Sequence, residues 1–138
     1  MDNRKGQAAI EYLAIVGLVL LFATPLLIRA QTSAGDLRRT ADMVAASNAL
    51  DTVSQAASFV YSQGEPARIT FRVSVPSGVN LSNVTGNYIH FQMDGSHGGG
   101  DLYEILEFNV TGDIPPDRGV YTMVAEAVGE NNVSIHEK

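Results

Sequence analysis

The sequence predicts an α+β fold in which a long N-terminal apolar helix packs on a C-terminal antiparallel sheet of five or six short strands. Two observations lead to this prediction. Residues 12–28 form an uncharged run of 17, and from residue 67 onward hydrophobic residues recur at every second position. Such a run is typical of a membrane-spanning helix, and a period of two is typical of half-buried strands. The expected segments are a short basic segment, an apolar helix, an amphipathic helix and a β-rich head, at residues 1–6, 7–35, 36–64 and 65–138.

The apolar run is long enough to cross a bilayer. At 1.5 Å per residue, a helix of residues 12–28 spans about 25 Å, and residues 8–10 extend it. Arg4 and Lys5 precede the run. The positive-inside rule therefore places the N-terminus in the cytoplasm and most of the chain outside.

The polar segment that follows remains compatible with a helix. It is rich in alanine, it has no proline up to Tyr61, and it carries an apolar stripe at 3-4-3-4-3 spacing, formed by Met43, Ala46, Leu50, Val53, Ala57 and Val60. This stripe predicts a helix that lies against an apolar surface. Gly64 suits a left-handed helix end, and Pro66 prevents the helix from resuming. Pro25 is expected to kink the apolar half, and residues 33–35 are a second weak point, so one helix or two in series are both possible.

Alternation of apolar and polar residues predicts the strands of the head. Turn residues such as Pro76 to Gly78 and Pro115 to Gly119 separate them, and residues 96–100 are expected to form a flexible loop or hairpin tip. The apolar face of the sheet needs a cover, and the stripe of the preceding helix is the available one. The strands are expected at Ile69 to Val75, Val79 to Val84, Ile89 to Met93, Leu102 to Val110, Val120 to Ala127 and Val133 to His136.

Composition argues against several functions. The net charge is −6, and residues 65–138 hold ten acidic residues against four basic ones, which disfavours nucleic-acid binding. Cysteine is absent, so disulfides and thiolate metal sites are excluded. The segment Asp94 to Asp101 lacks the acidic spacing of a calcium loop, and His90, His97 and His136 form no ligand spacing. Glu104 and Glu107 are expected on opposite faces of one strand. With no nucleophile motif or phosphate loop, we expect no enzymatic activity, metal or cofactor.

The single carboxylate of Glu11 is the most informative feature of the N-terminus. Inside hydrocarbon such a charge costs roughly 2.5–3.5 kcal/mol or more, so it needs a partner. The residues Arg4-Lys5-Gly6-Gln7, with Glu11 at the fifth position after Gly6, resemble the class III signal peptide of archaeal type IV pilin-like proteins. In that family a membrane-embedded peptidase cuts between the Gly and the Gln. The resemblance covers about the first thirty residues.

The resemblance implies a structural subunit of a surface filament. A leader of residues 1–6 would be removed, and the chain would pass from the cell membrane into an extracellular filament that serves adhesion. The implied partners are copies of the chain, a prepilin peptidase, and an assembly ATPase with its membrane platform. Glu11 would pair with the freed amine of Gln7 on a neighbouring subunit, and the ion pair would exist only in the assembly. Cyclisation of Gln7 would remove the charge of this amine and weaken the pair. The alternative interpretation is a glutamate at the membrane interface whose side chain reaches the lipid head groups.

Three alternatives remain open from sequence. Residues 30–34 could be an ordinary signal-peptidase site, although this leaves Glu11 unexplained. The chain could be a monomeric, single-pass membrane protein whose head binds a ligand or partner outside the cell. A secreted enzyme is the third alternative.

The head also holds four Asn-X-Ser/Thr triplets, which are acceptor sequences for sugar attachment. Four of the eight asparagines in the chain are followed two places later by Ser or Thr. All of them lie on the side of the membrane predicted to be external, so glycosylation is expected. The other interpretation is that these residue types gather in β turns. The triplets begin at Asn80, Asn83, Asn109 and Asn132.

Overall fold

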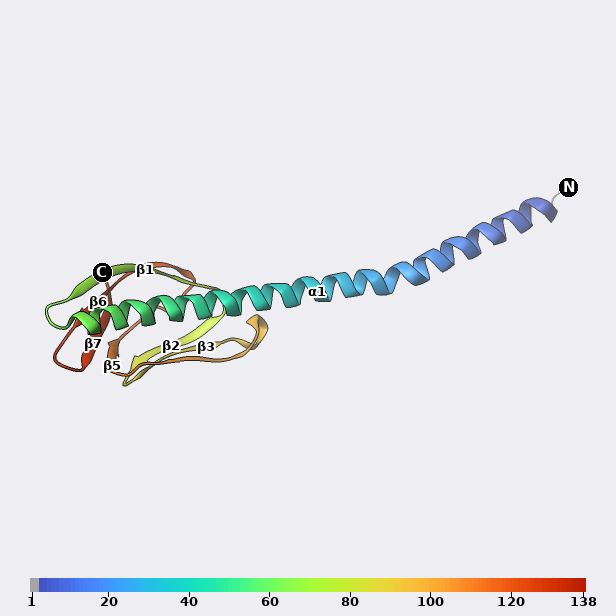
Figure 1. Ribbon diagram of the computed structural model, residues 1–138. Coiled ribbons are helices and arrows are strands. Elements are labelled where there is room, and N and C mark those ends of the chain that lie inside the picture. The colour runs from blue at the N-terminus through green and yellow to red at the C-terminus, as the bar shows by residue number, and fades with distance from the viewer. Residues whose placement is uncertain (1–2) are drawn as a thin grey trace. The chain divides into compact units, whose positions relative to one another are not determined.

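The computed structural model describes residues 3–138 and their side chains from Gly6 onward (Figure 1). The chain divides into two compact units, with the boundary between Leu37 and Arg38. The fold is α+β, as predicted, with one long helix and one sheet.

Helix α1 spans Asn3–Gln63 and makes up the whole of the described part of the first unit. The helix is assigned without interruption at Pro25 and at residues 33–35, so the chain forms one helix rather than two. Near Pro25, which cannot donate a backbone hydrogen bond, the Thr24 hydroxyl donates to the Leu20 carbonyl at 2.7 Å. The large apolar side chains from Ile10 to Ile28 are 58–71% exposed, apart from Val16, which is half-buried. This half of α1 therefore has no cover from its own chain.

The second half of α1 belongs to the head unit and carries the predicted stripe. Ala46, Leu50, Val53, Ala57 and Val60 are at most 3% exposed, and Met43 is half-buried. Ala49 and Ala56 are buried beside them, so the buried face is wider than the stripe alone. The small alanine side chains allow the strands to approach the helix closely.

The end of α1 confirms the predicted stop. Gly64 adopts a φ of +69°, which glycine reaches without a steric penalty, and its N–H donates to the Val60 carbonyl at 3.1 Å. Pro66 follows, and the first strand begins at Arg68.

Seven strands form one sheet, rather than the five or six that the sequence predicted. Their order across the sheet is β1-β6-β7-β5-β2-β3-β4, so β1 and β4 lie at the two edges. A short 3-10 turn, η1, covers Gly95–His97 between β3 and β4. The strands are β1 Arg68–Val75, β2 Val79–Thr85, β3 Tyr88–Met93, β4 Gly100–Ile105, β5 Asn109–Gly112, β6 Gly119–Ala127 and β7 Asn132–Glu137.

The extra strand arises because the expected strand from Leu102 to Val110 is two strands. β4 ends at Ile105, and β5 begins at Asn109 in the middle of the sheet. Leu106 and Phe108 in the link are buried, so the alternating pattern continues across the break and hides it in the sequence. Phe108 stacks on Tyr61 of α1 with ring centroids 4.3 Å apart. The prediction that Glu104 and Glu107 share a strand is therefore wrong, because Glu107 lies in this link.

One strand pair also departs from the antiparallel prediction. β5 is parallel to β7, with Asn109 opposite Asn132 and Thr111 opposite Ser134. β5 is antiparallel to its other neighbour, β2, and the β6–β7 hairpin fixes the direction of β7. A four-residue strand that inserts between two distant strands leaves no local signal of its direction.

The inner face of the sheet packs against one face of the second half of α1. In Figure 1, β1 lies on one side of this part of the helix and β2 and β3 lie on the other. Apolar side chains from four strands are fully buried in this core: Ile89, Phe91, Val110, Met123 and Ile135 are each 0% exposed. Because the chain has no cysteine, this packing replaces disulfides as the main stabilising interaction of the head.

A fragment of residues 36–138 is expected to fold by itself, and in it Leu50→Ala should lower the free energy of unfolding by about 2–5 kcal/mol, because it leaves a cavity in the core. Urea unfolding followed by circular dichroism measures this. Leu37→Ala is the matched control, since Leu37 lies on the same helix and is 71% exposed. It should change the stability by about 0.5 kcal/mol or less. Equal effects of the two changes, or a folded and monomeric 65–138 fragment, would show that α1 is not the cover of the sheet.

Candidate functional site

The residues predicted to control cleavage and assembly lie near the start of α1 on exposed positions. The Gln7 side-chain amide donates a hydrogen bond of 3.3 Å to Glu11 Oε1. Residues four apart in a helix lie on the same face, so the helical geometry brings the two side chains together. The uncut chain thus supplies the Glu11 carboxylate with a partner of its own. Pairing of Glu11 with the amine of a neighbouring subunit is a contact between chains, and it stays a prediction.

The Glu11 carboxylate retains acceptor capacity beyond this contact. An ionised carboxylate can accept about four hydrogen bonds, and the Gln7 amide supplies one. The Gln7 amide is a neutral donor, so this hydrogen bond does not neutralise the negative charge of an ionised Glu11 carboxylate. In an apolar environment a cationic group would be a stronger partner, because charge-assisted hydrogen bonds are roughly twice as strong as neutral ones.

The Gly6–Gln7 bond lies inside α1 rather than in a free leader segment, which the sequence did not indicate. A peptidase acts on an extended bond, so cleavage here requires the first turns of the helix to unwind. Glycine lowers the cost of unwinding, because it destabilises a helix by about 1 kcal/mol relative to alanine. A Cβ built at Gly6 meets nothing within 4 Å, so the fold of this chain does not itself require glycine at that position.

All four Asn-X-Ser/Thr triplets lie in strands, so the interpretation that they are turn residues does not hold. Asn80 and Asn83 are in β2, Asn109 is in β5 and Asn132 is in β7. The first three side chains are exposed. Asn132 is half-buried, and its Oδ1 is buried with no hydrogen-bond partner among the described residues. The sequence could not distinguish Asn132 from the others.

The Gly-rich segment between β3 and β4 is packed against the rest of the head. The Asp94 N–H donates to the Gly78 carbonyl at 2.7 Å, and Arg39 Nε donates to the Ser96 carbonyl at 3.3 Å. Gly98 has a φ of +115°, and a Cβ there would lie 2.8 Å from the Met43 side chain. Glycine is favoured here because L side chains rarely adopt this φ, and a Cβ would also displace the Met43 side chain. The expected flexible loop is held by the helix and by the β1–β2 turn.

Asp94 also closes a local network within this segment. The Ser96 hydroxyl donates to the Asp94 carboxylate and lies 2.8 Å from His97 Nδ1. The hydrogen bond from Ser96 holds the pKa of Asp94 below its usual value, and the backbone of Gly95 and the His97 ring act in the same direction. Across residues 3–138, no group of three or more His, Cys, Asp or Glu side chains lies close enough to hold a metal ion.

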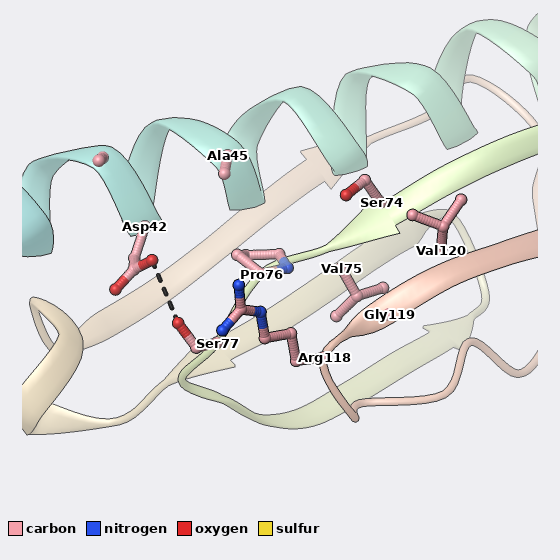
Figure 2. A pocket seen from close by; sticks show the side chains of 10 residues that line it. Asp42, Ala45, Ser74, Val75, Pro76, Ser77, Arg118, Gly119 and Val120 are labelled. Atoms are coloured by element: carbon pink, nitrogen blue, oxygen red, sulfur yellow. Dashed lines mark hydrogen bonds between the residues drawn. The ribbon is translucent and has the colours of Figure 1, made fainter.

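A hollow of about 450 Å³ lies between α1, the end of β1 and the start of β6 (Figure 2). The Ser77 hydroxyl donates to Asp42 Oδ1 at 3.2 Å on one side of it. The exposed Arg118 side chain lies on the other side, with its guanidinium directed toward Ser77 (Figure 2). A second hollow of about 270 Å³ shares Ala45 and Ser74 with the first. Together they form a groove between the helix and the edge strand β1, which the sequence did not predict.

No protein-family model, curated protein or solved structure matches this chain. The arrangement of elements is nevertheless pilin-like in coarse terms. A long N-terminal helix has an apolar first half that is long enough to cross a membrane, and its second half packs on a mostly antiparallel sheet.

Gly6→Val should block cleavage after residue 6, because the branched side chain crowds the backbone where the peptidase must approach. Gly17→Val is the matched control. It makes the same change in the same helix, at another glycine whose Cβ meets nothing within 4 Å. Mass spectrometry of the N-terminus should find Gln7 as the first residue in wild type and Gly17→Val, and Met1 in Gly6→Val. A wild-type chain that begins at Met1 or Ala34 would contradict the predicted site.

Glycosylation is expected to favour the three exposed triplets over the fourth. Intact-mass measurement of protein from producing cells should give a mass above that of the sequence. Replacing Asn80, Asn83 or Asn109 singly by Gln should lower the mass by one glycan. Asn132→Gln should leave it unchanged, since the Asn132 side chain is half-buried. An unmodified wild-type mass would exclude glycosylation in those cells.

Proposed function

We propose that this chain is the precursor of a pilin-like structural subunit, which is cut after Gly6 and polymerises through its apolar helix into a surface filament. The observation that carries the proposal is the exposure of the apolar half of α1. A window of 18 residues in this helix is apolar enough to span a membrane, and none of it is buried within the chain. Such a surface must be covered by lipid or by other chains.

The position of Glu11 supports a second environment besides lipid. A carboxylate in the first part of a membrane helix is costly, and among the side chains described from Gly6 onward its hydrogen-bond partner is the neutral Gln7 amide. Cleavage after Gly6 would create a cationic amine at Gln7, and a neighbouring subunit could offer this amine to Glu11. The ion pair would then favour the polymer over a subunit alone in the membrane.

The fold of the head supports display on the outside of such a filament. Its core is closed by its own helix and sheet, so the head does not need the polymer for stability. The partners proposed with this function are further copies of the chain, a prepilin peptidase, and an assembly ATPase with its platform. Adhesion is the proposed role of the finished filament. A monomeric membrane-anchored binding protein is the second candidate, because it would use the same anchor.

Glu11→Gln should leave membrane insertion and cleavage after Gly6 intact but strongly reduce the number of filaments, since it removes the charge that pairs between subunits. Glu11→Leu should have the same effect and make the lone subunit more stable in lipid. Electron microscopy of producing cells and N-terminal mass spectrometry measure the two properties. Asp51→Asn is the control, because it removes an exposed carboxylate from the second half of the same helix.

Two results would count against this function. If both Glu11 variants assemble as readily as wild type, the carboxylate is an interfacial residue without a role in assembly. If wild type forms no filament while the complete assembly machinery is present, the membrane-anchored binding protein becomes the better account.

A further inference from the structure

The sheet of the head has two open edges, formed by β1 and β4. An open edge presents unpaired backbone N–H and C=O groups, which can pair with a strand of another chain. Both edges lie in the head unit, and both are exposed along much of their length. Their chemistry differs.

The register of β1 shows which of its backbone groups face outward. The Ala127 N–H donates to the Ala67 carbonyl at 3.0 Å, so residues 67 and 127 form a hydrogen-bonded pair. Such pairs alternate along an antiparallel ladder. Residues 69, 71, 73 and 75 therefore bond to β6, and the groups that face outward belong to Arg68, Thr70, Arg72 and Ser74.

The same reasoning applies to β4. The Leu106 N–H donates to the Asn87 carbonyl at 2.8 Å, which makes residues 87 and 106 a hydrogen-bonded pair. Residues 100, 102 and 104 therefore bond to β3. The outward backbone groups of β4 belong to Asp101, Tyr103 and Ile105.

The two edges carry opposite charge. Strand β1 contains Arg68 and Arg72 and no acidic residue, whereas β4 contains Asp101 and Glu104 and neither Lys nor Arg. Two β1 edges would bring arginines together, and two β4 edges would bring carboxylates together. Like charges opposite each other destabilise a strand pair, and opposite charges stabilise it. The charge pattern therefore disfavours pairing of like edges and favours pairing of β1 with β4.

Both edges are accessible for such a pairing. Arg68, Thr70, Arg72 and Ser74 of β1 are exposed, and Arg72 and Ser74 also line the hollow of about 270 Å³ between β1 and α1. On the other edge Tyr103 is 56% exposed and Ile105 is 74% exposed. Asp101 is also exposed, and its Oδ1 lies 3.2 Å from His90 Nε2 of the same chain.

We propose that β1 of one copy pairs with β4 of the next, so that adjacent heads form a continuous sheet. An antiparallel register with Arg72 opposite Asp101 also places Thr70 opposite Tyr103 and Arg68 opposite Ile105. Because the interface joins two different edges, each copy at the end of a row keeps one unpaired edge that can bind the next copy. The row can therefore continue without closing into a ring. This inference rests on the proposed filament, because it names the contact between heads within that polymer.

Paired cysteines in the full-length chain test this contact directly, because the natural chain has none. The variant with Thr70→Cys and Tyr103→Cys should give a ladder of disulfide-linked multimers on mild oxidation of producing cells, as seen on non-reducing gels. Residues opposite each other in a hydrogen-bonded pair have Cα atoms about 5.5 Å apart, within the range of a disulfide. Each single-cysteine variant should give no ladder and no dimer.

A charge exchange gives an independent measurement in the double-cysteine background. Arg72→Asp alone and Asp101→Arg alone should each lower the yield of multimers about fivefold, the effect of a surface ion pair at the upper end of its usual strength. The two changes together should restore the yield, because the exchanged charges are again opposite. A loss without restoration would overturn the pairing.

The outcomes separate this inference from the proposed function. Filaments without a disulfide ladder would overturn the edge contact and leave the filament subunit in place. A ladder without filaments would support the edge contact and count against the filament. Dimers in either single-cysteine variant would show pairing of like edges, and the absence of both ladder and filaments would overturn both proposals.

Discussion

The burial of one face of α1 under the sheet is the interaction on which the rest of the head depends. The side chains of Ala46, Val53, Ala57 and Val60 are 0% exposed, and they face strands whose inner residues are equally buried. Without this helix, the inner face of the sheet would lie in water. The helix also contacts two of the connections between strands. Met43 and Arg39 contact the segment between β3 and β4, and Tyr61 stacks on Phe108 in the link between β4 and β5.

The two halves of α1 differ in how their apolar residues are distributed around the helix. In the head, apolar residues recur at three- and four-residue spacing, because one face contacts the sheet and the other contacts water. Between Tyr12 and Ile28 they occur all around the helix, and none of them is buried by the chain. The first half therefore needs an apolar environment supplied from outside. Lipid can supply it to a precursor, and neighbouring helices can supply it in a polymer.

Local sequence patterns predicted the helix and most strands. The strand order and the direction of each strand depend on pairings between distant residues, which these patterns do not show. The stripe, the stop at Gly64 and most strands follow from periodicity and turn chemistry, so they could be read directly from the sequence. The division between β4 and β5 could not, because Leu106 and Phe108 continue the alternation while the chain crosses to another part of the sheet. The same is true of the candidate sites. Glu11 and the asparagine triplets are visible as motifs, whereas the half-burial of Asn132 and the opposite charges of the open edges depend on the strand order.

The central claim is that the exposed apolar half of α1 becomes the core of a polymer. Electron cryo-microscopy of filaments sheared from producing cells tests this most directly, when combined with antibody labelling of the head to identify the subunit. The account predicts a core of bundled helices that begin at Gln7, with labelled heads on the outside. A labelled chain found only as separate molecules in the membrane, with the machinery present and the N-terminus at Met1, would contradict it.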